Sequence, residues 1–104
     1  MELLLRRIFM INDSFEWDDT KAATNYAKHR VTFEAACEAF NDPFALDWVD
    51  DGQDSGEQRF ATLGMAEGRL VFVAYTMRGH RIRVISARLP EPFERRRYHD
   101  DNQG

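Results

Sequence analysis

The first half of the chain combines one short extended run with helical spacing of its apolar residues. Residues 14–17 are hydroxylated, aromatic or charged and predict a short β-strand. Asp18 can then cap a helix, because its carboxylate can accept hydrogen bonds from the unpaired N–H groups of the first turn. Alanines and a tyrosine recur four residues apart over residues 19–30, so we predict a helix there.

A second helix is predicted over residues 33–40, with Thr32 as its cap. Its apolar residues are spaced i, i+3, i+4 and i+7, which is the pattern of one helix face packed against a core. These residues are Phe33, Ala36, Cys37 and Phe40. The helix is expected to end at Asp42-Pro43, because proline disfavours the helical conformation of the residue before it.

Apolar and polar residues alternate in much of the second half, which is typical of half-buried β-strands. Four strands are predicted, over residues 45–49, 58–65, 69–77 and 81–89. An acidic loop over residues 50–56 separates the first of them from the second. Glu67-Gly68 and Gly79-His80 can form hairpin turns, so the last three strands are expected to form an antiparallel meander.

A final helix is predicted over residues 92–101. Pro92 suits its first position, because proline lacks the N–H group that a helix leaves unpaired there. The order of elements is a short strand, two helices, a strand, a three-stranded meander and a helix. That order predicts an α+β domain with helices packed on a meander sheet. We expect one domain over residues 15–104, preceded by an N-terminal extension over residues 1–14.

Composition narrows the class of protein. The chain has 104 residues, of which 43% are hydrophobic, enough for one domain with a modest core. The single cysteine, Cys37, excludes an internal disulfide, and the three histidines are too scattered for a metal site. We therefore expect no metal and no cofactor. No signal peptide or membrane span is recognisable, so we expect a cytoplasmic protein with no membrane partner.

Charge is sorted along the chain, although the formal net charge is only -4. Residues 1–58 contain 5 lysines and arginines against 13 acidic residues. Residues 59–104 contain 9 arginines against 5 acidic residues. A basic end on an acidic protein indicates a surface that binds a polyanion.

Arginines recur on the strand predicted over residues 81–89. Strict alternation places its side chains on two faces: Ile82, Val84 and Ser86 on one, and Arg81, Arg83 and Ile85 on the other. Arg88 lies near the strand end, where a bulge or an edge can aim it at a groove. A guanidinium group stays charged and can bind two oxygens of one phosphate at once, so these arginines favour a phosphate-binding surface. The same pattern also fits a solvated face that protects a sheet edge.

The final helix carries further polar groups. Glu94 and Tyr98 are four residues apart and share a face, with Arg97 beside them. Tyr98 can equally be a packing residue, and Arg95-Arg96 fit a solvated helix flank. His29, near the end of the first helix, fits a cap-like or surface position as well as a functional one.

Two ordered sets of residues resemble a known family. The first set is Phe15-Glu16-Trp17-Asp18, Lys21, Asn25, Lys28-His29, Val31, Phe33-Glu34, Ala36, Phe40 and Asp42. The second is Gly56-Glu57-Gln58-Arg59-Phe60, Gly64, Arg78, Arg83-Val84-Ile85-Ser86-Ala87-Arg88 and Glu94-Arg95-Arg96-Arg97-Tyr98. Over roughly residues 15–99, the chain resembles the BrnT toxins. It departs from them in Val84, where the family usually has isoleucine, and in Pro90 and Pro92 before the last helix.

The resemblance implies a RelE-like fold and a ribonuclease toxin of a type II toxin–antitoxin system. It implies cleavage of RNA without a metal, and hence inhibition of translation. The implied partner is a BrnA-type antitoxin that neutralises the toxin and binds operator DNA, so the toxin meets DNA only in that complex. The acidic N-terminal half is then expected to stay away from the surface that meets RNA.

The implied reaction is attack of a ribose 2′-hydroxyl on the adjacent phosphate, which needs a base, an acid and stabilising cations. Arginine is a poor proton carrier, so arginines suit the stabilising role. Glu57, His29, Glu94 and Tyr98 are the open candidates for proton transfer. We therefore expect a catalytic set of Arg59, Arg83, Arg88, Glu57 and Tyr98, with RNA contacts from Arg81, Arg97, His29 and Lys28.

Two other classes of function fit the same residues. One is a nucleic-acid-binding module without catalysis, which would bind RNA in a salt-dependent manner and leave it intact. The other is a structural partner whose basic face docks an acidic protein. A neighbouring gene for a short DNA-binding protein would favour the toxin over both.

Overall fold

The helices begin at the capping residues that the sequence predicts. The computed structural model describes residues 8–12, 14–50 and 57–102. The Asp18 carboxylate accepts hydrogen bonds from the N–H groups of Thr20 (2.8 Å) and Lys21 (3.3 Å), and helix α2 (Asp19–His29) follows. The Thr32 hydroxyl accepts from the Ala35 N–H at 3.0 Å and starts helix α3 (Phe33–Ala39).

The last helix, α4 (Pro92–Asp101), also begins as predicted. Pro92 occupies its first position, and Glu91 and Glu94 form a reciprocal capping box. No helix in the described parts of the chain is both long and apolar enough to cross a membrane.

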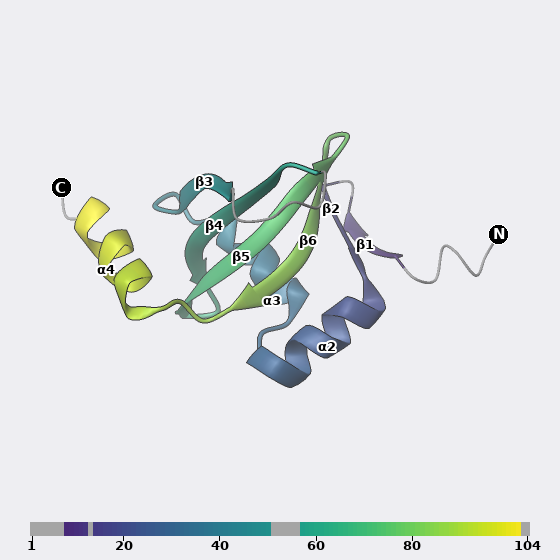
Figure 1. Cartoon of the computed structure of the whole chain (residues 1–104), viewed down its shortest axis with the longest axis horizontal. Coiled ribbons are helices and arrows are strands. Elements are labelled where there is room, and N and C mark those ends of the chain that lie inside the picture. The colour runs from purple at the N-terminus through teal and green to yellow at the C-terminus, as the bar shows by residue number, and fades with distance from the viewer. Residues whose placement is uncertain (1–7, 13, 51–56, 103–104) are drawn as a thin grey trace.

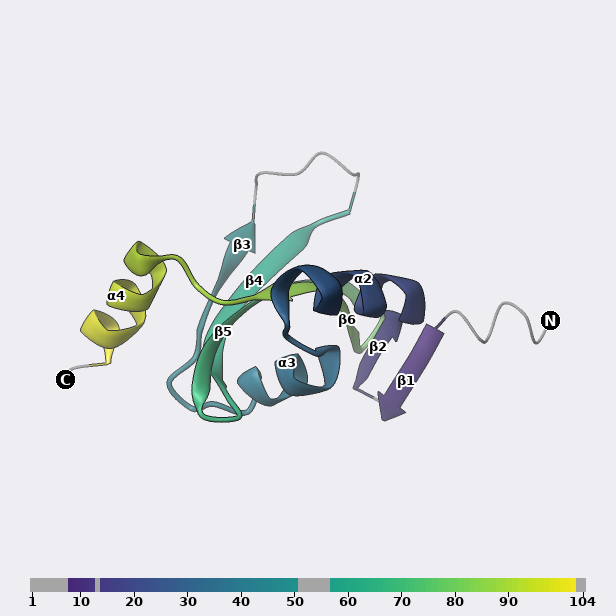
Figure 2. The ribbon, with the colours of Figure 1, turned by 90° about the horizontal axis from the view of Figure 1, so that it is seen from below.

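Within the described residues, six strands form one sheet in the order β1-β2-β6-β5-β4-β3 (Figures 1 and 2). Their bounds are β1 (Ile8–Asn12), β2 (Phe15–Asp18), β3 (Leu46–Asp50), β4 (Arg59–Ala66), β5 (Arg69–Arg78) and β6 (Arg81–Arg88). The meander of β4, β5 and β6 is confirmed, and β3 pairs antiparallel with β4 at one edge. The α+β architecture is therefore the predicted one.

The other edge of the sheet differs from the prediction. β2 lies beside β6 and runs parallel to it, and β1 pairs antiparallel with β2. β1 belongs to the segment that we set apart as an extension, and it forms the edge strand of the same sheet. The domain boundary at residue 15 stays a prediction. Apart from Asp50, the predicted acidic loop lies outside the described residues.

The main core lies between one face of the sheet and the helices α2 and α3. Trp17 and Phe33 are almost fully buried and meet edge to face at 5.8 Å between ring centroids. The predicted stripe on α3 is confirmed, since Phe33 and Ala36 are buried and Cys37 and Phe40 pack against the same core. Figure 2 shows α2 and α3 on the same side of the sheet, and α4 beyond its end.

A smaller core holds α4 on the opposite face of the sheet. Tyr98 packs there with Leu63 and Leu70, with Leu46 and Phe72 at its margin. Because α4 covers only this end, the two faces of the sheet are unequally covered.

Candidate functional site

A bulge in β6 changes which of its side chains share a face. Tyr75 of β5 pairs with Val84 and Ala74 pairs with Ser86, which leaves Ile85 as an extra residue. Alternation therefore shifts by one position after Val84. The prediction that Ser86 shares a face with Ile82 and Val84 is wrong, because buried Ala87 takes that place in the core.

The same shift brings Arg88 to the face that carries Arg81 and Arg83. Without the extra residue, Arg88 would point toward α2 and α3. Arg59 of β4 lies on this face too, since its neighbour Phe60 stacks on Tyr75 on the helix-covered side. We call the surface formed by Arg59, Arg81, Arg83 and Arg88 the arginine face. Figure 1 views the sheet from this side, with α3 behind it.

The strand register places a row of small side chains between these arginines. The row is Ala61, Ala74 and Ser86, one on each meander strand. Arg59 and Arg83 lie on one side of it, and Arg88 lies on the other. Ala61 and Ala74 are buried, so this part of the row is not open to solvent.

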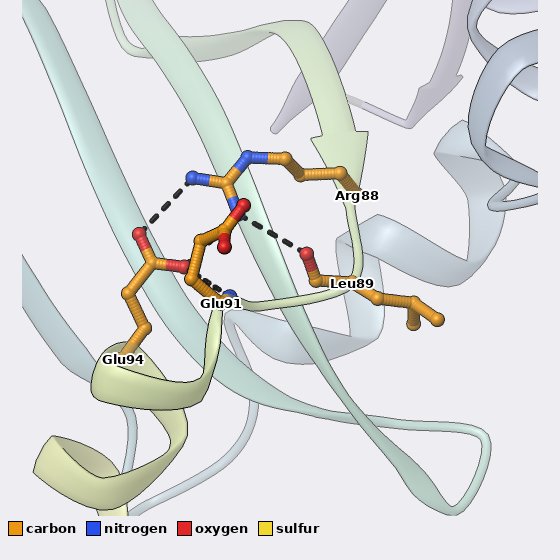
Figure 3. Close-up of polar contacts among 4 residues, drawn as sticks. All are labelled: Arg88, Leu89, Glu91 and Glu94. Atoms are coloured by element: carbon orange, nitrogen blue, oxygen red, sulfur yellow. Dashed lines mark hydrogen bonds and ion pairs between the residues drawn. The ribbon is translucent and has the colours of Figure 1, made fainter.

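Arg88 is held in a fixed position by four contacts. Its Nη1 and Nη2 atoms donate to Glu94 Oε1 and Oε2 at 2.9 and 3.0 Å, and Nη1 also donates to the Leu89 carbonyl at 3.1 Å (Figure 3). The guanidinium lies 4.0 Å from the centroid of the Phe72 ring, a cation–π geometry. The Arg88–Glu94 pair thereby joins the end of β6 to the start of α4.

Glu94 is a carboxylate in this arrangement. Its burial alone raises its pKa, but hydrogen bonds from Arg88 and the Glu91 N–H, together with the charge of Arg88, lower the pKa below its usual value. At neutral pH the pair is therefore fully ionised, and Arg88 already has a partner of opposite charge.

The other arginines of the face differ in their partners. Arg83 Nε donates to Glu16 Oε2 at 3.0 Å, and both side chains are largely shielded from solvent. Arg81 Nε is shielded from solvent and has no hydrogen-bond partner. For the Arg59 guanidinium, we find no ion pair with any described residue. Among the described residues, Arg59 and Arg81 are thus the arginines of this face whose positive charge no carboxylate neutralises.

Comparison with known protein families decides the class of this chain. Residues 17–94 match the family model of the ribonuclease toxin BrnT of type II toxin–antitoxin systems. The chain belongs to the BrnT family. A search among curated proteins finds no match. The matched span contains Arg59, Arg81, Arg83 and Arg88, so the whole arginine face lies within the family domain.

Membership in the BrnT family gives the general class of activity and partner. It makes the chain a toxin of a type II toxin–antitoxin system, with ribonuclease activity as the property of the family and an antitoxin as the implied partner. No group of three or more His, Cys, Asp or Glu side chains within the described ranges is placed to hold a metal ion.

In this BrnT chain, Tyr98 lies apart from the arginines. Its hydroxyl donates to Asp42 Oδ2 at 2.6 Å, and its ring is buried against Leu63 and Leu70. Burial and the Asp42 carboxylate raise its pKa to about 12. These contacts anchor α4, and a catalytic role for Tyr98 stays a prediction.

Glu57 lies two residues before Arg59, just outside β4, and is exposed. Its Oε2 lies 2.9 Å from Nε of Arg78, which is also exposed. Its position two residues from Arg59 favours the same face. Its predicted catalytic role remains a prediction.

The predicted RNA-contacting residues outside the sheet lie in two places. Lys28 and His29, at the end of α2, line a pocket of about 330 Å³ together with Lys21 and Ser86. Ser86 belongs to the same face as Arg83 and Arg88, so this pocket adjoins the arginine face at the β6 edge. Arg97 is exposed on α4 and lines a separate pocket beneath that helix.

Sequence reasoning did not assign a role to Asn25 or Glu16. Asn25 is buried and its side chain bonds to the backbone of Val31 and Ala87. Glu16 comes from the acidic half of the chain and neutralises Arg83. Both were visible only as positions of the family resemblance, because Ala87 and Arg83, their partners on β6, lie more than 60 residues away along the chain.

Proposed function

We propose that this chain is a metal-independent endoribonuclease that cleaves RNA on the arginine face and so inhibits translation in the cytoplasm. The observation that carries the proposal is the bulge at Ile85, which gathers Arg88 with Arg59, Arg81 and Arg83 on the less covered face of the sheet. Family membership supports ribonuclease chemistry, and the arginine face supplies cations where a phosphate can lie.

Cleavage proceeds by attack of a ribose 2′-hydroxyl on the adjacent phosphate. The new bond closes a 2′,3′-cyclic phosphate, the bond from phosphorus to the 5′-oxygen of the next nucleotide breaks, and that oxygen leaves as a hydroxyl after it takes up a proton. The negative charge on the phosphate oxygens increases in the transition state. Preorganised guanidinium groups can stabilise that charge, which is a role that a metal ion has in other nucleases. Arg83 and Arg88 are each paired with a carboxylate and act as positioned hydrogen-bond donors. Arg59 has no such partner among the described residues, so it contributes most to binding the phosphate.

Proton transfer is assigned to Glu57 in this proposal. Glu57 is exposed and lies two residues before Arg59, just outside β4. Its ion-pair partner Arg78 keeps it near the arginine face. Tyr98 is the less suitable group, because its hydroxyl must first leave Asp42 and its pKa of about 12 is far from neutral.

The antitoxin partner is of the BrnA type and silences the toxin by covering the arginine face. Acidic side chains of such a partner complement Arg59 and Arg81, which carry the unneutralised charge. Operator DNA is met only through the antitoxin. Lys28, His29 and Arg97 extend the basic surface that RNA contacts.

The experiment compares Arg59→Ala with Arg95→Ala, an exposed arginine on α4 away from the sheet. Purified proteins are incubated with RNA in the presence of EDTA, and cleavage is followed on a gel. We expect Arg59→Ala to lower the cleavage rate about 100-fold or more, the usual effect of removing one transition-state donor, and Arg95→Ala to cleave as the wild type does. Arg88→Ala is a poorer choice, because it also breaks the contact that holds α4.

Three results would contradict the proposal. A wild type that shifts RNA on a native gel but leaves it intact is a binding module without catalysis. Equal rates for Arg59→Ala and Arg95→Ala would place the reaction elsewhere. Loss of cleavage in EDTA, restored by a divalent cation, would show that the reaction needs a metal.

A further inference from the structure

The pocket between α2 and β6 contains both lysines of the chain. The sequence has only two lysines, Lys21 and Lys28, and they are seven residues apart, so they share one face of α2. The helix packs against β6 (Figure 2). Both lysines line the same pocket of about 330 Å³, together with His29. The half of the chain that is poor in cations therefore gathers these cations at one place, which we call the α2–β6 pocket.

The side chains of the α2–β6 pocket suit an anion. Among the described residues that line it, none is acidic. The hydroxyl groups of Thr20, Thr24 and Ser86 add hydrogen-bond donors to the two lysine ammonium groups. Neither ammonium group forms an ion pair with any described residue. The pocket beneath α4 differs, because the carboxylates of Asp50 and Glu94 lie on its walls.

Asn25 fixes the geometry of the α2–β6 pocket, which it also lines. Its side chain bonds to both backbone groups of Ala87, at 2.8 Å and 3.1 Å. These bonds tie the middle of α2 to β6, between Lys21 and Lys28 along the helix. The face that carries the lysines is therefore held against the strand before a ligand binds, which lowers the cost of ordering the site.

Ser86 connects the α2–β6 pocket to the arginine face. Ser86 and Arg88 are alternate residues of β6 on the same face, so they lie about 6–7 Å apart along the strand. Arg83 lies on the same face on the other side of Ser86. One nucleotide of an extended RNA strand spans such a distance. A phosphate in the pocket and a phosphate at Arg88 can therefore belong to neighbouring nucleotides.

We propose that the α2–β6 pocket binds the phosphate next to the cleaved one in the substrate RNA, with Lys21 and Lys28 as its cations. This subsite rests on the proposed function. It is a discrete site for one phosphate group, and it sets where along the RNA strand the enzyme cleaves. An RNA phosphate fits it better than a protein partner does, because Ile85 is the single apolar side chain among its described lining residues. Protein interfaces need a larger apolar centre.

The binding test uses a single-stranded RNA hexamer with 2′-O-methyl groups throughout, which lacks the attacking hydroxyl and stays intact. We expect Lys21→Ala and Lys28→Ala each to weaken binding about 10-fold, the effect of losing one hydrogen bond from a charged group. Lys21→Arg and Lys28→Arg keep the charge and should keep most of the affinity. The matched control is Arg95→Ala, which removes an exposed cation on α4 and should bind as the wild type does.

The salt dependence of binding counts the phosphates that the pocket holds. In the double variant Lys21→Ala/Lys28→Ala, the slope of log affinity against log salt should become shallower by about 0.7, the value for one phosphate of a single strand. Both lysines are exposed, so the variants should fold, and circular dichroism checks this.

Lysine signals in an NMR spectrum report on the pocket directly. A protein with isotope-labelled lysine has two lysine side-chain signals, and both come from this pocket. The hexamer should shift both signals in the wild type. Inorganic phosphate should shift the same two signals, and the hexamer should displace it. A role of the lysines in stability alone would leave both signals unchanged.

Steady-state cleavage of unmodified RNA separates binding from chemistry. The double variant should raise KM about 10-fold or more and change kcat little, because the phosphate in the pocket does not react. Arg59→Ala should instead lower kcat, since Arg59 belongs to the site of the cleaved phosphate.

The outcomes distinguish this subsite from the proposed function. Wild-type affinity and KM in the double variant overturn the subsite, while cleavage by the wild type keeps the ribonuclease. Loss of antitoxin binding without loss of RNA binding also overturns it and makes the pocket a protein-docking site. Signals that shift with inorganic phosphate but not with the hexamer overturn it as well, in favour of a free anion. Binding of the hexamer through both lysines, in a protein that leaves unmodified RNA intact, supports the subsite and overturns the ribonuclease.

Discussion

Asn25→Ala should destabilise the domain by about 3 kcal/mol. Asn25 is the buried residue of α2, at 6% exposure. Its Nδ2 atom donates to the carbonyls of Val31 (3.1 Å) and Ala87 (2.8 Å), and its Oδ1 atom accepts from the Ala87 N–H at 3.1 Å. β2 pairs with β6 only as far as Arg83. Beyond that point, the Asn25 side chain supplies the hydrogen-bond partners of the Ala87 backbone at the edge of β6.

The magnitude follows from these three bonds. Each contributes about 0.5–1.5 kcal/mol net, and more where its loss leaves a buried group unpaired. Val31 and Ala87 are 0% exposed, so water does not replace the amide in the folded protein. A loss of about 3 kcal/mol is a large part of the 5–15 kcal/mol that stabilises a typical domain. Asn25→Asp should be at least as harmful at neutral pH, because it sets a carboxylate oxygen against two carbonyl oxygens.

Urea unfolding followed by circular dichroism measures this loss as a lower midpoint. Thr24→Ala is the matched control, because Thr24 is the preceding residue of the same helix and is exposed. Its free energy of unfolding should change by no more than about 0.5 kcal/mol. A loss below about 1 kcal/mol for Asn25→Ala, or one equal to that of the control, would refute the assignment of Asn25 as the contact that fixes α2 to β6.

Two other predictions concern the packing of α3 and α4. Gly64→Ala should lower the free energy of unfolding by about 1–3 kcal/mol in the same assay, because the added Cβ atom would lie 2.5 Å from the backbone oxygen of Ala39. An unchanged midpoint would contradict this expectation. Burial raises the pKa of Asp42, but hydrogen bonds from Tyr98 and from the Met65 and Phe44 N–H groups bring the pKa below its usual value. Ionised Asp42 therefore stabilises the fold above the pKa that it has in the unfolded chain. This stabilisation is lost as the pH falls through the lower pKa of the folded protein. Unfolding midpoints between about pH 7 and pH 3 should therefore fall less steeply in Tyr98→Phe than in the wild type, and identical pH profiles would rule out the Asp42 contact as a source of acid sensitivity.

Sequence reasoning located the ends of most elements because their signals are local. Asp18 and Thr32 cap the helices that follow them, and Pro92 occupies the first position of α4. Glu67 and Gly68 both adopt positive φ, as the hairpin turn that they form requires. Each of these signals acts within about four residues, which is the range that a sequence pattern can report.

The pairing of β2 with β6 could not be predicted in this way. It joins Glu16 to Arg83 across most of the chain, and it depends on how α2 and α3 pack against the meander. β1 was missed for a related reason, since it forms an edge strand only because β2 is already in the sheet.

The candidate site depends most on the feature that alternation alone misses. A strict period of two puts Arg88 with the core residues Ile82 and Val84, and a single bulge reverses its direction. The sequence does not mark the bulge, because Ile85 is an ordinary strand residue. The family resemblance named Arg59, Arg83 and Arg88, and the strand register places these three arginines on one face of the sheet.

The order of charged residues along the sequence is also a poor guide to which charges meet on the surface, because strand pairing decides which residues lie together. The acidic half was expected to stay away from the basic surface, yet Glu16 lies against Arg83 and Asp50 pairs across the strands with Arg59. Carboxylates therefore neutralise or border several arginines that the count of residues 59–104 treats as equivalent. In the proposed site, a phosphate meets Arg83 and Arg88 already oriented by their carboxylate partners, which lowers the entropy lost on binding. Under this proposal Arg59 supplies charge and the other two arginines supply geometry, so we expect the single substitution Arg59→Ala to weaken binding of the phosphate without disturbing the fold.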